Sequence, residues 1–296
     1  MNKMFSGTGV ALVTPFKKDF SIDFEKIDIL VNRAIANGID YIVALGTTAE
    51  TPTLSYEERK QILETILESV NERVPVVAGI GCNNPIEVNE QIHFFDLRKV
   101  SAILSVTPYY NRPQQQGLIA HYKSIAEQSP LPVILYNVPA RTGVNIEAAT
   151  TLQIARSIPK VIGIKEASGN LPQIMEIIHN RPEDFLVISG DDAITLPLLA
   201  CGADGVISVV ANAFPRDFSF MVQHALRGDF ARAKTYHYKL LDCISACFRD
   251  GNPAGVKAFL QAQGLIDDYV RLPLCTVHSE IKQLIRNLLQ IYDNGI

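Results

Sequence analysis

The chain has 296 residues, a formal net charge of −4 and a hydrophobic fraction of 47%. This length can hold one large domain or two modest ones, and the composition is ordinary for a globular protein. No basic stripe is present, so nothing suggests nucleic acid or an anionic membrane as a partner. No apolar run reaches the roughly 20 residues of a membrane-spanning helix, and the first residues do not resemble a secretory signal. The cytoplasm is the expected location.

Eight short apolar runs recur along the first three quarters of the chain. Each is nearly continuous rather than alternating, which is typical of parallel strands buried on both faces. The runs are Thr8–Val13, Tyr41–Leu45, Val74–Gly79, Ala102–Val106, Val133–Tyr136, Val161–Ile164, Phe185–Ser189 and Gly205–Val209.

Amphipathic helical patterns separate these runs. Ser55 and Glu58 form a capping box ahead of one apolar helical face. Asn84 and Pro85 give the N-cap and first-turn proline of another helix. Strand and helix therefore alternate eight times, which predicts an α/β fold of the (β/α)₈ TIM-barrel type.

After about residue 225 only helical periodicity remains. Three helices are expected there, over Phe230–Phe248, Pro253–Gly264 and Ser279–Asn294. We therefore predict a catalytic barrel over residues 1–225 and a C-terminal three-helix extension over residues 226–296. No flexible linker separates them, so the two parts are expected to move as one body.

The cysteines and histidines give no positive case for a metal. The five cysteines are odd in number and scattered, and no HxH, HExxH or CxxC motif occurs. Cys243 and Cys247 lie one helical turn apart in an apolar stretch, and we interpret them as core residues. The sequence predicts neither a metal nor a cofactor.

Reactive groups of such a barrel lie where its strands end. Lys165 directly follows the apolar run Val161–Ile164. An ammonium group loses hydration there, which favours the neutral amine and its attack on a carbonyl to form a Schiff base. The alternative is a structural lysine that pairs with a neighbour such as Glu166 or snorkels to the rim of the barrel.

Polar groups also end the fifth and second runs. The Tyr136 hydroxyl can point into the barrel mouth and pass a proton, and Arg141 on the following loop could hold a carboxylate with two hydrogen bonds. Thr47 and Thr48 follow Gly46, and their hydroxyl and backbone N–H groups can hold a small carboxylate. Each group also has a structural alternative. Tyr136 could be an aromatic in a barrel layer, Arg141 could form a surface ion pair, and Thr47 with Thr48 could form a common Ser/Thr turn.

The remaining strand ends are less informative. Tyr109 and Tyr110 are adjacent and cannot both pack into one core, so at least one is expected at an interface or a site. Gly190 would allow a substrate to approach closely. Asp191 and Asp192 after it are as consistent with a helix N-cap as with a chemical role.

Together the motifs GTTAET, VTPYYNRP, YNVPARTG, GIKEASGN and SGDD closely resemble the dihydrodipicolinate synthase family. The resemblance runs from about Gly7 to about Pro273. It includes Asn252-Pro253 with Lys257, and the segment that begins at Arg271. It implies a class I aldolase-type lyase that condenses pyruvate with L-aspartate 4-semialdehyde in the diaminopimelate branch of lysine biosynthesis.

The resemblance also implies roles for the catalytic residues. Lys165 would form the imine with pyruvate. Tyr136, Thr47 and Tyr110 would form a proton relay, in which Tyr110 reaches in from a neighbouring subunit. A homotetramer built as a dimer of dimers would be the usual assembly.

Other residues would bind the substrates. Thr48 would hold the pyruvate carboxylate, and Arg141 would recognise the carboxylate of the semialdehyde. The backbone of Gly190 and Ile207 would line the pyruvate site.

The comparison with the family pattern also shows one departure and implies one regulatory site. Ala49 stands where the family has glycine, so the turn is expected to differ slightly. A lysine-binding allosteric site would involve Asn83, Glu87 and Tyr109, with Tyr56 and Arg59 where lysine-sensitive members often have histidines. Glu87 has an alternative role in helix capping.

Three other functions remain open at this point. An N-acetylneuraminate lyase or a 2-keto-3-deoxy-sugar acid aldolase would share the barrel and the lysine. A nicotinamide-dependent oxidoreductase is suggested by the near-GxGxxG segment 79–84, but Asn84 breaks the last glycine. A barrel that binds a keto acid without turning it over would be a sensor rather than an enzyme.

Overall fold

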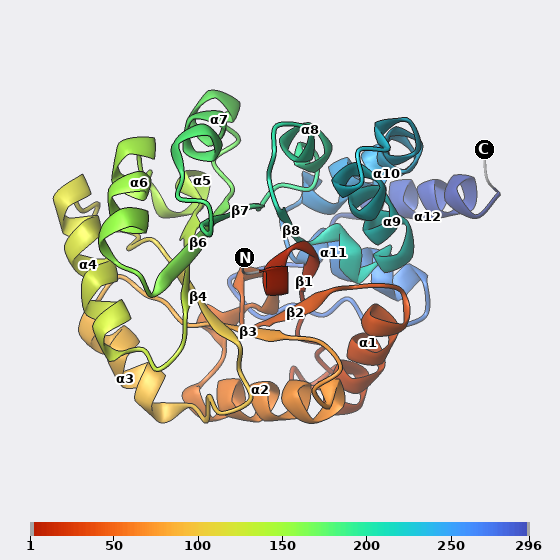
Figure 1. Ribbon diagram of the computed structural model, residues 1–296. Helices are drawn as coiled ribbons and strands as arrows, with labels where there is room; N and C mark the ends of the chain where they lie inside the picture. The colour runs from red at the N-terminus through yellow and green to blue at the C-terminus, as the bar shows by residue number, and fades with distance from the viewer. Residues whose placement is uncertain (1–2, 295–296) are drawn as a thin grey trace.

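Figure 1 shows the computed structural model, which describes residues 3–294. Eight parallel strands close into a barrel in chain order, and β1 pairs with both β2 and β8. The strands are β1 Gly7–Ala11, β2 Tyr41–Ala44, β3 Val76–Gly79, β4 Ala102–Val106, β5 Val133–Asn137, β6 Val161–Glu166, β7 Leu186–Ser189 and β8 Gly205–Ser208. The predicted (β/α)₈ barrel is confirmed, and each strand lies at its predicted apolar run.

Helices surround the barrel, as Figure 1 shows. They are α1 Phe24–Ala36, α2 Tyr56–Val70, α3 Pro85–Phe94, α4 Gln115–Gln128, α6 Ala148–Ser157, α7 Leu171–Asn180, α8 Thr195–Ala200 and α9 Pro215–Leu226, with the one-turn α5 Pro139–Thr142 after β5. The capping box of α2 is present: Ser55 Oγ accepts from Glu58 N at 3.1 Å, and Glu58 Oε2 accepts from Ser55 N at 2.9 Å. The Asn84 side chain caps α3 as predicted.

Three further helices follow the barrel: α10 Phe230–Arg249, α11 Ala254–Ala262 and α12 Ser279–Asn294. They lie together at one side of the barrel, next to α8 and α9 (Figure 1). The three-helix extension is therefore confirmed. Val10 of β1 shares one hydrophobic core with Leu240 of α10 and Leu289 of α12. The domain boundary between residues 225 and 226 stays a prediction. The predicted domains also include residues 1–2 and 295–296, which lie outside the described residues.

A second cluster of buried side chains fills the inside of the barrel. It includes Tyr41, Val77, Leu104, Ile134 and Ile188. Such layers make the barrel a packed core rather than a pore. Chemistry is thereby confined to the mouth, where Tyr136 and Val138 end the cluster.

The glycines of the near-GxGxxG segment have a packing role. A Cβ on Gly79 would lie 2.2 Å from Leu45 O, and one on Gly81 would lie 2.8 Å from Val106 N. These residues are glycines because neighbouring backbone approaches them closely. The sheet is a closed barrel and not the open doubly wound sheet of a dinucleotide-binding domain, so the oxidoreductase hypothesis loses its structural basis.

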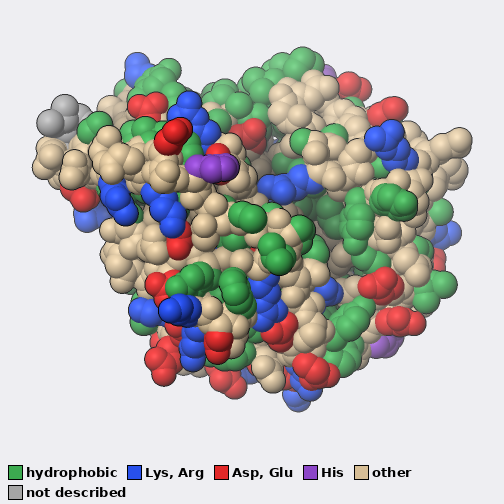
Figure 2. Space-filling model, turned by 180° about the vertical axis from the view of Figure 1, so that it is seen from behind, with side chains coloured by type: hydrophobic (Ala, Val, Ile, Leu, Met, Phe, Trp, Pro, Cys, Tyr) green, Lys and Arg blue, Asp and Glu red, His purple; other side chains and the backbone are tan. Residues whose placement is uncertain are grey.

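Charged side chains of both signs are interspersed over the face seen in Figure 2. Among residues 3–294, no helix has the length and apolarity needed to cross a membrane. Within the same range, no group of three or more His, Cys, Asp or Glu side chains is placed to hold a metal ion. Cys243 and Cys247 are buried in the hydrophobic core of α10, so their interpretation as core residues is confirmed.

Candidate active site

Lys165 and Tyr136 lie side by side in the barrel mouth. The parallel register pairs Tyr136 of β5 with Lys165 of β6, so both side chains point to the same face of the sheet. Lys165 Nζ lies 4.3 Å from the centroid of the Tyr136 ring. The lysine is only 5% exposed, and Tyr136 is buried as well. The amine is thus held in a largely dry setting beside a phenol.

The carboxylate of Glu166 lies on the opposite face of β6. It accepts hydrogen bonds from Asn137 Nδ2 at 2.9 Å and from Gln173 Nε2 at 3.0 Å. Burial raises the pKa of Glu166. No ion pair forms between Lys165 and Glu166, so the pairing with Glu166 suggested as the structural alternative for Lys165 is not observed.

Gly190 packs closely against the lysine. A Cβ at this position would lie 3.1 Å from Lys165 Cε and 2.7 Å from the Ala167 Cβ. Any larger residue would therefore push against the aliphatic stem of Lys165. Ile207 of β8 is buried inside the barrel.

The side chains of Asp191 and Asp192 do not cap α8, because the N-cap residue of α8 is Ile194. Asp192 Oδ2 instead accepts hydrogen bonds from Val209 N and Val210 N.

The two threonines form a short 3₁₀ turn, Thr47–Ala49, after β2. Thr47 faces a cavity at the mouth, whereas Thr48 is buried. Positive φ angles occur at Leu45 and Glu50, on either side of this turn, and not at Ala49. The turn therefore makes no demand at position 49 that only glycine could meet. The backbone conformation at Ala49 therefore gives no reason for the turn to differ in shape, as had been expected from the replacement of glycine.

Two contacts that sequence reasoning missed fix this turn from the C-terminal helices. Asn252 Nδ2 donates to Thr48 Oγ1 at 3.0 Å. Lys257 of α11 forms an ion pair with Glu50, with 2.5 Å between Nζ and Oε1. Asn252-Pro253 and Lys257 were part of the resemblance to the family, but the sequence predicted no role for them. The C-terminal extension thus contributes directly to the site.

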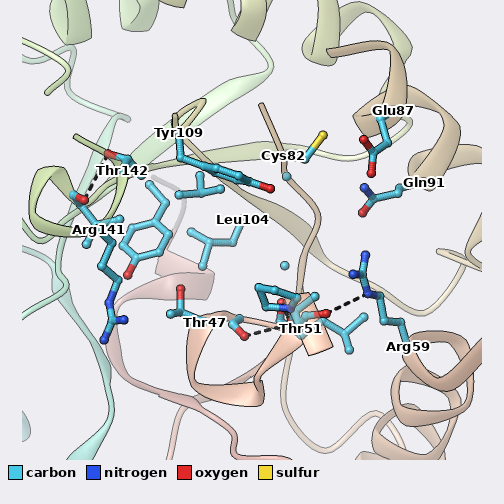
Figure 3. Close-up of a pocket in the computed structure, with 18 residues that line it drawn as sticks. Thr47, Thr51, Arg59, Cys82, Glu87, Gln91, Leu104, Tyr109, Arg141 and Thr142 are labelled. Carbon is cyan, nitrogen blue, oxygen red and sulfur yellow. Dashed lines mark hydrogen bonds between the residues drawn. The ribbon is translucent and has the colours of Figure 1, made fainter. Parts of the chain in front are cut away.

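A cavity of about 290 Å³ opens at the mouth (Figure 3). Thr47 and Arg141 lie at one side of it, and Arg59 and Glu87 lie at the other (Figure 3). Lys165 does not line this cavity, but its neighbour Tyr136 does. The cavity therefore connects the predicted catalytic residues to the predicted effector site.

The two adjacent tyrosines have different surroundings. Tyr109 lines the cavity (Figure 3). The Tyr110 side chain is 90% exposed, and its backbone has φ 73°, a left-handed conformation that is uncommon for a bulky residue. Within the single chain, the structure does not bring Tyr110 together with Tyr136 and Thr47.

The predicted effector residues cluster around Glu87. Tyr56 donates a hydrogen bond to Glu87 Oε1 at 3.0 Å, and the Arg59 guanidinium lies 5.2 Å from the Tyr56 ring. Burial and the Glu87 carboxylate raise the pKa of Tyr56. Glu87 bonds to Tyr56 rather than to the N-cap residue Asn84. The backbone carbonyl of Asn83 accepts from Asn111 Nδ2.

The model of the dihydrodipicolinate synthetase family matches residues 4–292 of this chain. The chain belongs to this family. The 4-hydroxy-tetrahydrodipicolinate synthase of Parabacteroides distasonis is 51% identical over 286 residues, which are 95% of this chain and 96% of the relative. The synthase of the same name from Phocaeicola vulgatus is 52% identical over 283 residues, or 96% and 95% of the two chains.

Solved structures of the dihydrodipicolinate synthase family have the same fold. The Thermotoga maritima enzyme superposes with a TM-score of 0.95 at 38% identity and covers 98% of this chain and 99% of its own. The Cyanidioschyzon merolae enzyme, solved with lysine bound, gives a TM-score of 0.93 at 35% identity with the same coverage. The barrel and its C-terminal helices are therefore shared with these two enzymes.

Proposed function

We propose that this chain is a 4-hydroxy-tetrahydrodipicolinate synthase that condenses pyruvate with L-aspartate 4-semialdehyde through an imine on Lys165. The observation that carries the proposal is the amine of Lys165, buried in the barrel mouth beside the Tyr136 ring. Relatives of that name match about half of the residues over nearly the whole chain, which supports the same activity and a place in lysine and diaminopimelate biosynthesis.

The chemistry follows from the groups at the mouth. The neutral amine of Lys165 attacks the pyruvate carbonyl, and water leaves to give the imine. The protonated imine is a better electron sink than the ketone, so the methyl group loses a proton and an enamine forms. The enamine carbon then attacks the aldehyde of the second substrate. Each step moves a proton, which hydroxyl groups within hydrogen-bond reach can carry.

In this proposal Thr48 and the neighbouring backbone N–H groups hold the pyruvate carboxylate. Gly190 lies next to this site, because a Cβ at its position would come within 3.1 Å of Lys165 Cε. Gly190 and Ile207 line the pyruvate site with their backbone. Tyr136 and Thr47 carry protons, and both face the same cavity.

A direct assay tests the reaction. Purified protein is mixed with pyruvate and, in separate reactions, with aspartate semialdehyde, N-acetylmannosamine and a sugar-derived aldehyde. Product formation only with the semialdehyde is expected. Turnover of a sugar aldehyde instead would favour the lyase or sugar-acid aldolase alternatives, and an imine without turnover of any aldehyde would favour a sensor.

Replacement of Arg141 by Ala is expected to weaken use of the semialdehyde. The guanidinium is exposed at the cavity, where it can form charge-assisted hydrogen bonds to a carboxylate. Loss of such bonds costs about 1.5–3 kcal/mol, so kcat/KM for the semialdehyde should fall about 10–100-fold. Pyruvate should still form the imine. The control is Arg156→Ala on α6, where the guanidinium bonds to Asn180 O; equal losses in both variants would contradict the assignment.

The homotetramer is part of the proposal, and Tyr110 gives it a test. Its exposed side chain suits a residue that completes the site of a neighbouring subunit. Lys165→Ala and Tyr110→Phe variants should each be nearly inactive. When the two are unfolded, mixed and refolded, mixed dimers should regain activity, because one of their two sites then has both native residues. Absence of recovery in mixed dimers confirmed by mass would refute a role for Tyr110 across the interface.

We also propose L-lysine as an inhibitor that binds around Glu87. The carboxylate of Glu87 can pair with an ammonium group, and Arg59 and Tyr109 line the same cavity. The rate should fall at millimolar lysine, and Glu87→Gln should remove this effect. Glu90→Gln, an exposed neighbour on α3, is the control and should remain sensitive. An unchanged rate of the parent enzyme in lysine would refute the idea. The cytoplasmic location stays a prediction.

A further inference from the structure

The contact between Asn252 and Thr48 links the C-terminal extension to the predicted carboxylate site. Asn252 lies between α10 and α11, and Thr48 lies in the turn after β2, 204 residues away in sequence. Both side chains are buried, with exposures of 8% and 2%. Asn252 Nδ2 donates to Thr48 Oγ1 over 3.0 Å. A hydrogen bond between two buried groups is strong, and it fixes the orientation of both side chains.

The direction of this hydrogen bond decides what Thr48 can offer a ligand. A hydroxyl group has one proton to donate and two lone pairs that accept. Because the Asn252 amide donates to the oxygen, the proton of Thr48 points elsewhere. Within residues 3–294, Thr48 Oγ1 donates to no side chain or backbone carbonyl, so its proton is available to a carboxylate.

The surroundings hold Asn252 and Thr48 at this distance. Glu50, two residues after Thr48, pairs with Lys257, five residues after Asn252. Glu50 Oε2 also accepts from the backbone N–H of Arg271 at 2.9 Å. The turn that carries Thr48 and the segment that carries Asn252 are therefore tied together at two points.

We propose that Asn252 is a positioning residue that turns the Thr48 hydroxyl into a hydrogen-bond donor for the carboxylate of the keto acid. This inference rests on the proposed function, because it needs a keto acid in the mouth. Asn252 acts through Thr48 and sets the affinity for pyruvate. It does not act on the aldehyde substrate.

A double-mutant cycle tests the proposal. Thr48→Val keeps the shape of the side chain and removes the hydroxyl, and Asn252→Ala removes the amide. The concentration of pyruvate that gives half-maximal borohydride trapping on Lys165 is measured for the parent, both single variants and the double variant. Asn252→Ala alone should raise it about tenfold, the equivalent of one hydrogen bond to a charged group. In the Thr48→Val background, Asn252→Ala should change it less than about twofold.

Asn252→Asp separates hydrogen-bond direction from simple loss of packing. It has nearly the same shape, but its carboxylate accepts from Thr48 and repels the keto acid. It should therefore raise the half-maximal pyruvate concentration more than Asn252→Ala does, with the KM for the semialdehyde changed far less. Gln261→Ala, which removes a hydrogen bond to Asp268 within the same helical extension, is the matched control and should leave pyruvate trapping unchanged.

The outcomes separate this inference from the proposed function. If the parent protein forms no adduct on Lys165, the proposed function fails and the role of Asn252 fails with it. If the parent forms the adduct but the two substitutions have additive effects, or Asn252→Asp traps pyruvate as the parent does, only the role of Asn252 is overturned. Asn252→Asp also serves as the test if Asn252→Ala does not fold.

Discussion

Lys165→Ala is expected to abolish both the borohydride-trapped pyruvate adduct and turnover. In the parent protein, digestion and mass spectrometry should place one reduced pyruvate on the peptide that contains Lys165. The reason is geometric: this amine is buried in the mouth, 4.3 Å from the Tyr136 ring, and among residues 3–294 no other lysine ends a strand there. Without the imine there is no comparable electron sink for the methyl proton, so the rate should fall by about a thousandfold or more.

Lys160→Ala is the matched control for that experiment. Lys160 precedes the same strand, β6, at its opposite end, and its Nζ donates to Ser129 O. This variant should keep the adduct and the rate. An adduct on a different lysine in the parent, or any adduct that persists in Lys165→Ala, would refute the assignment of the nucleophile.

Lys257→Met is expected to cause the largest loss of stability among the substitutions considered. Lys257 and Glu50 are fully buried, with 0% of each side chain exposed, and Lys257 Nζ also donates to Tyr269 O at 2.8 Å. Burial lowers the pKa of Lys257 to about 8, although the Glu50 carboxylate acts in the opposite direction. Removal of the amine leaves the Glu50 charge buried without its partner. Such changes cost about 3–5 kcal/mol, which corresponds to a fall in Tm of about 5–10 °C.

Two further variants make this prediction specific. Lys257→Met with Glu50→Gln removes both charges and should regain part of the lost Tm. Lys239→Met breaks a more exposed pair with Asp217, in which the lysine is 38% exposed, and should change Tm by only a degree or two. A Tm of Lys257→Met equal to that of the parent, or a double variant less stable than the single one, would contradict the argument. Thermal unfolding followed by circular dichroism measures all four proteins.

The barrel and much of the site could be predicted because their signals are local. Each strand is a short apolar run, and Lys165 and Tyr136 directly extend such runs. In parallel strands with matched register, residues at these ends are brought together by the topology itself. The pairing of Tyr136 with Lys165 then follows from the order of the strands.

The contacts of Asn252 and Lys257 could not be derived from the same patterns. They join residues more than 200 positions apart, across the boundary between barrel and extension. The choice between a capping role and a side-chain contact for Glu87 was also open. It depends on where α2 places Tyr56 relative to α3, which no local pattern specifies.

Lys165 and Glu166 are adjacent in sequence, but their side chains lie on opposite faces of β6. Lys165 lies in the barrel mouth, and Glu166 accepts hydrogen bonds from the amides of Asn137 and Gln173. Their separation depends only on the twofold alternation of a strand. Insertion of a single residue earlier in β6 would exchange them, so that an acid faced the keto acid and an amine entered the amide network. Which of the two groups meets the keto acid is therefore set by the number of residues that precede them in β6.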